Sequence, residues 1–227
     1  MGDFLATRGW EHIDGDQGNY NMDPMCQDAF GELWGAMQMA NAGQSVTEAQ
    51  WKPYYEFLAG EVKKALEKHE KVVLTFAIMG LFNGEEAYIR SQFPEIKFVY
   101  CCVDQAELIK RFHKRGEEYL AATGMTIQES WAHESNAEAR AQFGDEYSDE
   151  MYEKYVVTSF FSADSVKIKH DPDNNCYEIR NDDITNNQGI VELCKLCNIT
   201  DTSLDKESVA AVNLKRMKQM AELNGSV

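Results

Sequence analysis

The sequence predicts an α/β protein with a three-layer, mostly parallel sheet flanked by helices and a helical C-terminal extension. Residues 71–78 and 96–103 are nearly continuous apolar runs, which are typical of strands covered on both faces of a parallel sheet. Around these runs, apolar residues recur at the three- and four-residue spacing of amphipathic helices. A chain of 227 residues can bury a sizeable core, and an apolar content of 44% argues against global disorder.

The first half of the chain predicts alternating strands and helices. A short strand ends at Ile13 and is followed by a loop rich in Gly, Asn and Asp. Helical spacing then predicts helices over about 27–41 and 51–66, the second from a stripe of aromatic and aliphatic residues. A glycine loop at 80–84 opens a helix that ends before Pro94.

The second half is more polar and predicts further helices and one more strand. Asp104 can cap a helix. The segment Thr126-Ile127-Gln128-Glu129 has the pattern of a capping box for a helix that reaches toward Phe143. The remaining predicted elements are a helix at 148–161, a turn at 171–175, a strand at 176–180 and a helix at 188–198.

The C-terminal tail predicts a separate amphipathic helix, which suits docking on this domain or on a partner. Its apolar stripe consists of Ala210, Leu214, Met217 and Ala221. We see no internal repeat and no clear linker in the chain. We therefore expect residues 1–200 to form one α/β domain and residues 201–227 to form the helical extension.

The charge balance limits the partners and the compartment. The chain carries 22 basic and 38 acidic residues, a formal net charge of −16, and such a surface repels nucleic acid and anionic lipid. No apolar run approaches the ~20 residues that cross a bilayer, and the N-terminus lacks the basic-then-apolar order of a signal peptide. We expect no nucleic-acid partner, no membrane insertion, and a cytoplasmic or other intracellular soluble location.

The spacing of two of the six cysteines, Cys194 and Cys197, allows two interpretations. A separation by two residues is used by zinc and redox sites. The same two side chains also lie on one apolar face of a predicted helix, and no closely spaced pair of histidines completes a site. We favour packed apolar side chains and expect no metal.

Three ordered segments resemble a known enzyme family. The matching segments are Ile13-Asp14-Gly15-Asp16, the Gly43, Glu48 and Pro53 positions within residues 43–55, and Lys97-Phe98-Val99-Tyr100 followed by Arg111 and Arg115. From Phe4 to about Trp131, the order of elements resembles a gluconokinase, a member of the shikimate-kinase-like branch of the P-loop kinases. The resemblance covers a little over half of the chain.

The resemblance implies four site residues. It makes Asp14 and Asp16 candidate catalytic residues that orient a hydroxyl group, and Arg111 and Arg115 candidate cofactor-binding residues that contact phosphate. ATP and Mg²⁺ would be the cofactors of an active enzyme. The residues alone leave a second interpretation open, in which the carboxylates form an exposed Asp-Gly turn and the arginines pair with glutamates on their own helix.

The chain departs from the family where phosphates would bind. A glycine-rich phosphate loop should come about 30 residues before the strand, but eight residues precede Gly9. The glycine loop at 80–84 is followed by Glu85 and Glu86, where a phosphate loop has Lys and then Ser or Thr. The strand that goes with the loop would lie in the middle of the sheet, and we expect residues 166–180 to fill that gap.

Two functions are compatible with this sequence. The favoured one is a kinase-like pseudoenzyme that acts as a binding or structural subunit of a larger assembly, with a protein partner and no cofactor. The alternative is a small-molecule phosphotransferase that uses ATP on a sugar acid or nucleotide, with the phosphate loop supplied elsewhere. Loss of the loop removes most of the electrostatic stabilisation of phosphoryl transfer, which favours the first.

Overall fold

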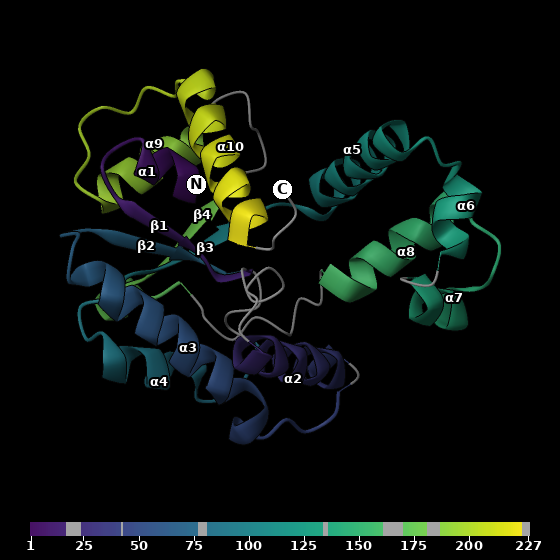
Figure 1. Cartoon of the computed structure of the whole chain (residues 1–227), viewed down its shortest axis with the longest axis horizontal. Coiled ribbons are helices and arrows are strands. Elements are labelled where there is room, and N and C mark those ends of the chain that lie inside the picture. Colours follow the sequence, from purple (N-terminus) through teal and green to yellow (C-terminus); the bar gives the residue numbers. More distant parts are fainter. Residues whose placement is uncertain are drawn as a thin grey trace. The chain divides into compact units, whose positions relative to one another are not determined.

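The computed structural model describes residues 1–16, 24–41, 43–76, 81–133, 136–160, 170–180 and 187–223. Within these ranges the chain is a mostly helical α/β protein with ten α-helices and four short strands (Figure 1). It divides into two compact units. The first unit comprises Met1–Tyr100, Ser165–Ile179 and Asp183–Val227, and the second comprises Cys101–Asp164 and Arg180–Asp182.

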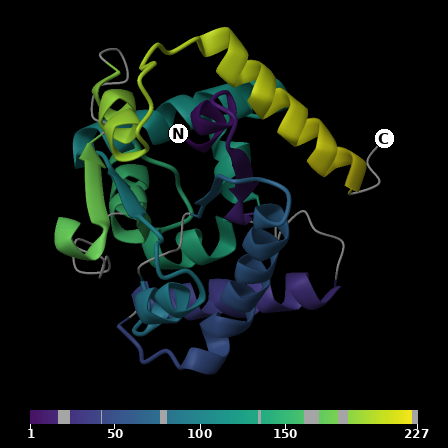
Figure 2. The same cartoon turned by 90° about the vertical axis from the view of Figure 1, so that its left-hand side faces the viewer.

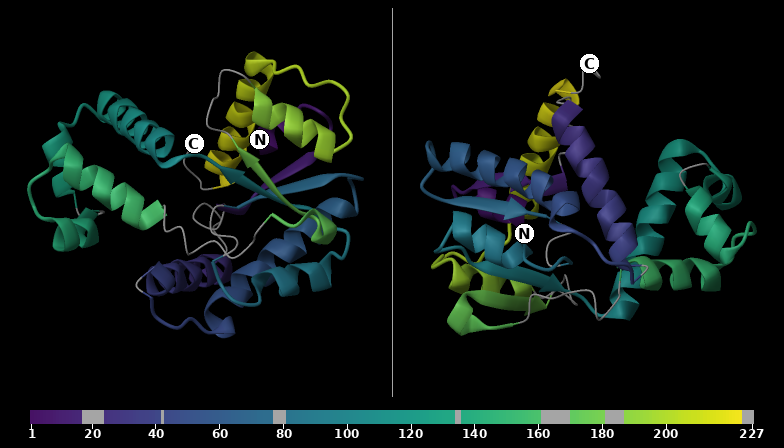
Figure 3. Two further views of the ribbon diagram at one scale, coloured as in Figure 1. Left: turned by 180° about the vertical axis from the view of Figure 1, so that it is seen from behind. Right: turned by 90° about the horizontal axis from the view of Figure 1, so that it is seen from below.

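The four strands form two pairs. β1 (Glu11–Asp14) lies parallel to β2 (Val72–Thr75), and β3 (Phe98–Cys102) pairs with β4 (Cys176–Arg180) in a second two-stranded sheet. Figures 2 and 3 show β2 and β3 as the inner strands of the two pairs, and no ladder joins them within the described ranges. The strand predicted to end near Ile13 is confirmed, and the strands are divided into separate sheets.

The larger hydrophobic core of the first unit is built by three helices. These are α2 (Pro24–Asn41), α3 (Glu48–Leu66) and α4 (Glu85–Gln92), and Leu74 of β2 and Phe98 of β3 pack with them. Its largest fully buried side chains are Leu33, Tyr54, Tyr55, Leu58 and Ile89. The two predicted helices before residue 70 are confirmed as α2 and α3, and α4 ends before Pro94 as predicted.

A smaller core lies on the opposite face of the inner strands. It contains residues of α1 (Gly2–Ala6) and α9 (Gln188–Leu196), with Val73 of β2 and Val99 of β3 packed against it. Successive residues of a strand point to opposite faces, so both inner strands contribute to both cores. Full burial of the strand at 71–78 is wrong, since all of β2 is half-buried. Residues 77–80 lie outside the described residues.

The second unit is helical. Its elements are α5 (Gln105–Thr123), α6 (Ile127–Ala132), α7 (Ala137–Phe143) and α8 (Asp149–Phe160). The Asp104 side chain caps α5 by accepting a hydrogen bond from the Glu107 amide at 2.8 Å, and the capping box at Thr126 is present. Both predictions are confirmed. Trp131 and Val156 are buried in this unit.

The single helix predicted to run from the capping box to Phe143 is wrong, because it is divided into α6 and α7. Arg140 of α7 donates hydrogen bonds through Nη1 to the carbonyls of Trp131 and His133, at 2.7 and 2.6 Å. The last carbonyls of a helix have no partner within the helix. The arginine supplies that partner and lets α6 end.

The turn before β4 is a short 3-10 helix, Pro172–Asn174, and an antiparallel bridge between Asp171 and Cys176 closes it. The predicted turn and strand are therefore confirmed. The prediction that residues 166–180 fill the gap in the sheet is wrong for β4, which pairs with β3 on the side away from β2 (Figure 3). Residues 166–169 lie outside the described residues.

The C-terminal helix is α10 (Lys206–Leu223). Docking on this domain through the predicted stripe is wrong at Ala210 and Leu214, whereas docking of the stripe on a partner stays a prediction. The Leu214 side chain is 54% exposed and Ala210 is exposed, while α10 packs against α1 with another face. The side chains of Met217 and Ala221 lie outside the described residues. In the part of the chain that the structure describes, none of the helices combines the length and apolar character needed to span a bilayer.

Candidate functional site

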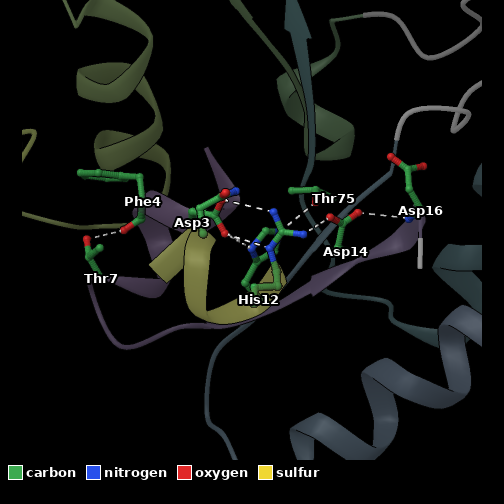
Figure 4. Close-up of polar contacts among 9 residues, drawn as sticks. Asp3, Phe4, Thr7, His12, Asp14, Asp16 and Thr75 are labelled. Atoms are coloured by element: carbon green, nitrogen blue, oxygen red, sulfur yellow. Dashed lines mark hydrogen bonds and ion pairs between the residues drawn. The ribbon is translucent and has the colours of Figure 1, made fainter. Parts of the chain in front are cut away.

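Asp14 lies at the C-terminal end of the parallel pair (Figure 4). It is the last residue of β1 and stands opposite Thr75, the last residue of β2. The Asp16 amide donates a hydrogen bond to Asp14 Oδ1 at 3.1 Å, so the two candidate carboxylates share one tight turn. A Cβ atom on Gly15 between them would lie 2.8 Å from the Phe76 ring. Glycine is therefore the residue that fits this turn.

The carboxylate of Asp14 forms an ion pair with an arginine of α10. Arg216 Nη1 pairs with Asp14 Oδ2, and Arg216 Nε donates to Asp3 Oδ1 at 3.2 Å. Asn213, one turn earlier on α10, donates to Asp3 Oδ2 at 2.8 Å. The side chains of Asp3, Asp14 and Arg216 are 15%, 19% and 19% exposed. Both carboxylate oxygens of Asp14 thus have partners within the chain.

His12 connects this cluster to β2. Its Nδ1 lies 2.9 Å from Asp3 Oδ1, and its Nε2 lies 2.8 Å from Thr75 Oγ1. A carboxylate accepts but does not donate, so Nδ1–H donates to Asp3, and in the neutral ring Nε2 then accepts from the Thr75 hydroxyl. We call the set of Asp3, His12, Asp14, Thr75, Asn213 and Arg216 the carboxylate network.

Burial and neighbouring charges shift two pKa values in the carboxylate network. Burial lowers the pKa of His12 below its ordinary value of 6.5, against the opposing effect of Asp3. Burial alone would raise the pKa of Asp3, but hydrogen bonds from Asn213 and Arg216 outweigh it and lower the pKa. The structure thus favours a neutral imidazole between an ionised carboxylate and a hydroxyl.

The order of carboxylate, imidazole and hydroxyl is the one that activates a hydroxyl nucleophile in many transferases and hydrolases. Here the ring is enclosed. The His12 side chain is 7% exposed, and a Cβ atom on Gly2 would lie 2.2 Å from its Nε2. The backbone of Gly2 therefore covers the imidazole, and the geometry is that of a packed polar network that links α1, β1, β2 and α10.

Sequence reasoning assigned no role to His12, Asp3 or Arg216. His12 and Asp3 are nine positions apart, whereas Arg216 is 202 positions from Asp14 and Thr75 is 63 positions from His12. Spacing along the chain gives no signal for such contacts. A weaker signal was available for His12. Successive residues of a strand point to opposite faces, so His12 lies on the face opposite to that of Ile13.

The two candidate arginines lie on α5 in the second unit, whereas Asp14 and Asp16 lie in the first. Arg111 Nε donates to Glu107 Oε1 at 2.8 Å. The Arg115 guanidinium lies over the Phe112 ring, 5.9 Å from its centroid. The pairing of Arg111 with Glu107 is the ion pair expected in the interpretation without a ligand.

The glycine loop before α4 is closed by a buried carboxylate. Glu85 is 1% exposed and accepts a hydrogen bond from the Phe82 amide at 2.6 Å and another from the Tyr55 hydroxyl. Gly84 precedes it with φ of +90°, a conformation that favours glycine. The first position of this helix therefore holds a carboxylate of the protein itself, where a phosphate loop would receive an anion.

The two cysteines with metal-like spacing lie on α9. Cys194 is fully buried and Cys197 is half-buried, and burial raises the pKa of both thiols. Among the described residues, no group of three or more histidine, cysteine, aspartate or glutamate side chains is placed to hold a metal ion.

In comparisons with known proteins, no family model matches the chain, and neither the curated proteins nor the solved structures gave a significant match.

Proposed function

We propose that this chain is a kinase-like pseudoenzyme that works as a binding or structural subunit with a protein partner. The observation that carries the proposal is the engagement of Asp14 by Arg216 of α10. A general base needs a free oxygen lone pair that faces its substrate. In this chain Asp14 instead joins α10 to the end of β1.

The arrangement of the first unit supports the kinase-like part of the proposal. Helices lie on both faces of β2 and β3, as in a three-layer α/β domain. The two strand pairs leave an interruption between β2 and β3. In the proposed fold, this is where the strand that carries the phosphate loop would lie.

The charged side chains around the loop before α4 and on α5 support the pseudoenzyme part of the proposal. Phosphoryl transfer depends on several backbone amides and cations that converge on the phosphates. The α4 start carries Glu85 in place of such a cation, and Arg111 is paired with Glu107. We therefore expect the chain to bind ATP·Mg²⁺ weakly or not at all.

One observation favours a second candidate, the ATP-dependent phosphotransferase. Asp14 and Thr75 lie at the C-terminal ends of two parallel strands, which is where ligands bind in open α/β sheets. In this candidate Asp14 orients the accepting hydroxyl of a sugar acid or nucleotide.

Titration with ATP·Mg²⁺ and with ADP tests the proposal, with melting temperature and heat of binding as readouts. A ligand at ~100 times its Kd stabilises a protein by about 2.7 kcal/mol, a shift of several degrees at this chain length. We expect no shift at millimolar nucleotide for the wild-type chain or for Arg216→Ala, in which Asp14 is released. A shift that disappears in Asp14→Asn would reject the proposal in favour of the phosphotransferase.

A further inference from the structure

Helix α10 is attached to its unit mainly through polar contacts on one face. Val209, Asn213 and Arg216 follow the i, i+4, i+7 spacing of a single helix face. Of its described side chains, Val209 alone packs against a core cluster, and none is buried. An element with little apolar burial opens at low free energy, so the polar contacts of Asn213 and Arg216 decide whether α10 stays docked.

These contacts select an arginine. The guanidinium of Arg216 faces Asp3 through Nε and Nη2, at 3.2 and 3.4 Å, and faces Asp14 through Nη1. A planar group with three nitrogens can bridge two carboxylates in this way. A lysine ammonium is a single point charge and cannot reproduce the fork. The pair of carboxylates is thus shaped for a guanidinium.

We propose that Asp3 and Asp14, together with the apolar surface that receives Val209, form a receptor for an arginine-bearing amphipathic helix. In this chain α10 is the resident occupant, and a basic helical segment of a partner protein displaces it. The inference rests on the proposed function and names the chemistry of the partner.

Charge complementarity supports a basic partner. The polar part of the receptor is a pair of carboxylates in a chain with a net charge of −16, and such a surface attracts cationic segments from a distance. A partner has to compete with α10, which is held at high effective concentration because it belongs to the same chain. The partner can therefore bind only when α10 is released.

A labelled peptide with the sequence of residues 205–223 tests the inference on the full chain. We expect it to bind the Arg216→Ala chain at least tenfold more tightly than the wild-type chain, because the resident helix no longer fills the receptor. A peptide in which the arginine is replaced by lysine should bind at least tenfold more weakly. Lys218→Ala, an exposed position on the same helix, is the matched control and should behave as the wild type.

Hydrogen exchange keeps the test decisive if Arg216→Ala is less stable. Amides of α10 should exchange faster in Arg216→Ala than in Lys218→Ala, while those of α3 remain protected in both.

Equal binding of the arginine and lysine peptides, no binding of either, or unchanged exchange in α10 would each overturn the inference. Dimers of the wild-type chain in which α10 of one copy docks on the other would instead make a second copy the occupant and would also overturn the inference. Nucleotide binding has no part in these readouts, so a failure of the inference can be distinguished from a failure of the proposed function.

Discussion

Glu85 holds the loop before α4 against α3 with a buried carboxylate. In Glu85→Ala, the Tyr55 hydroxyl and the Phe82 amide lose their acceptor inside the aromatic core. Buried donors without partners are costly, and we expect a loss of about 3 kcal/mol in the free energy of unfolding. Urea unfolding followed by tryptophan fluorescence measures it, since Trp51 stacks on Phe82 at 6.3 Å between ring centroids.

Glu56→Ala is the matched control for this change. Glu56 is exposed on α3, and removal of an exposed side chain changes stability by less than about 0.5 kcal/mol. Equal losses in the two variants would mean that the carboxylate of Glu85 has no special role in stability.

His12 should make the stability of the first unit depend on pH near neutrality. Burial lowers the pKa of His12 in the folded chain, so the unfolded chain binds more protons as the pH falls below about 6.5. Stability is then fully present above pH 6.5 and decreases below it. The lowered pKa of Asp3 acts only near and below its ordinary value of 3.8, outside this range.

Melting temperatures between pH 7.5 and 5.5 measure this effect. We expect a smaller decrease in His12→Gln than in the wild-type chain, and the wild-type decrease in His69→Gln, which changes a histidine whose side chain is 43% exposed. If the melting temperature of His12→Gln decreased with pH as much as that of the wild-type chain, the pH dependence would belong to other groups.

The sequence drew attention to part of the carboxylate network, while a catalytic role for its residues stays a prediction. Asp14 and Asp16 were identified because an apolar strand followed by Asp-Gly-Asp is a local pattern. Asp3, Thr75 and Arg216 were missed, since their contacts depend on how β1, β2 and α10 assemble. Long-range hydrogen bonds between single side chains leave no periodicity in the sequence.

At the scale of the elements, local capping signals were the most reliable. Asp104→Ala removes the side chain that accepts from the Glu107 amide. Loss of an N-cap costs about 1 kcal/mol, and we expect faster hydrogen exchange in the first turn of α5 together with a small decrease in helical circular dichroism. Glu117→Ala, an exposed change on the same helix, should leave both signals unchanged. Similar exchange in the two variants would contradict a capping role.

Two expectations about helices were wrong for a shared physical reason: a single helix from the capping box to Phe143, and docking of α10 on its own domain through the apolar stripe. The division between α6 and α7 depends on Arg140, which reaches back to the carbonyls of α6. The docked face of α10 depends on Asn213 and Arg216, whereas the apolar stripe at Leu214 remains exposed. In both cases contacts of polar side chains decided the outcome, and neither the capping box nor the apolar stripe reports such contacts. Propensity and periodicity do not report such tertiary hydrogen bonds.

At the scale of the whole molecule, the two units have separate cores. Leu58 is buried in the larger core of the first unit and Val156 in the second unit. We expect Leu58→Ala to cost about 3 kcal/mol and to accelerate exchange in α3 and α4. Val156→Ala should cost about 2 kcal/mol and accelerate exchange in α6 and α8. Hydrogen exchange monitored by mass spectrometry can follow all four helices in one experiment.

The two substitutions act as controls for each other. If either one accelerates exchange equally throughout the chain, the units unfold as one cooperative body, and the separation of their cores has no energetic meaning. The sequence predicted the α/β character and most helices, but not this division, because no Gly-, Pro- or Ser-rich linker marks residues 100 and 165. At residues 100 and 179 the chain passes between the units within β3 and β4, with no change of composition.

The contact of α1 with α10 also sets the order in which the chain matures during translation. Asp3 can form its hydrogen bonds to Asn213 and Arg216 only after these residues, 210 and 213 positions later, have been synthesised. Arg8 likewise requires Ser203, 195 positions later. At about 5–20 residues per second, the ribosome needs roughly 10–40 s to deliver these partners. During that interval the carboxylate of Asp3 lacks both the guanidinium that pairs with its charge and the amide that donates a hydrogen bond to it. The helices of residues 101–164 have their described partners within a much shorter stretch, and they can finish folding while α10 is still unsynthesised.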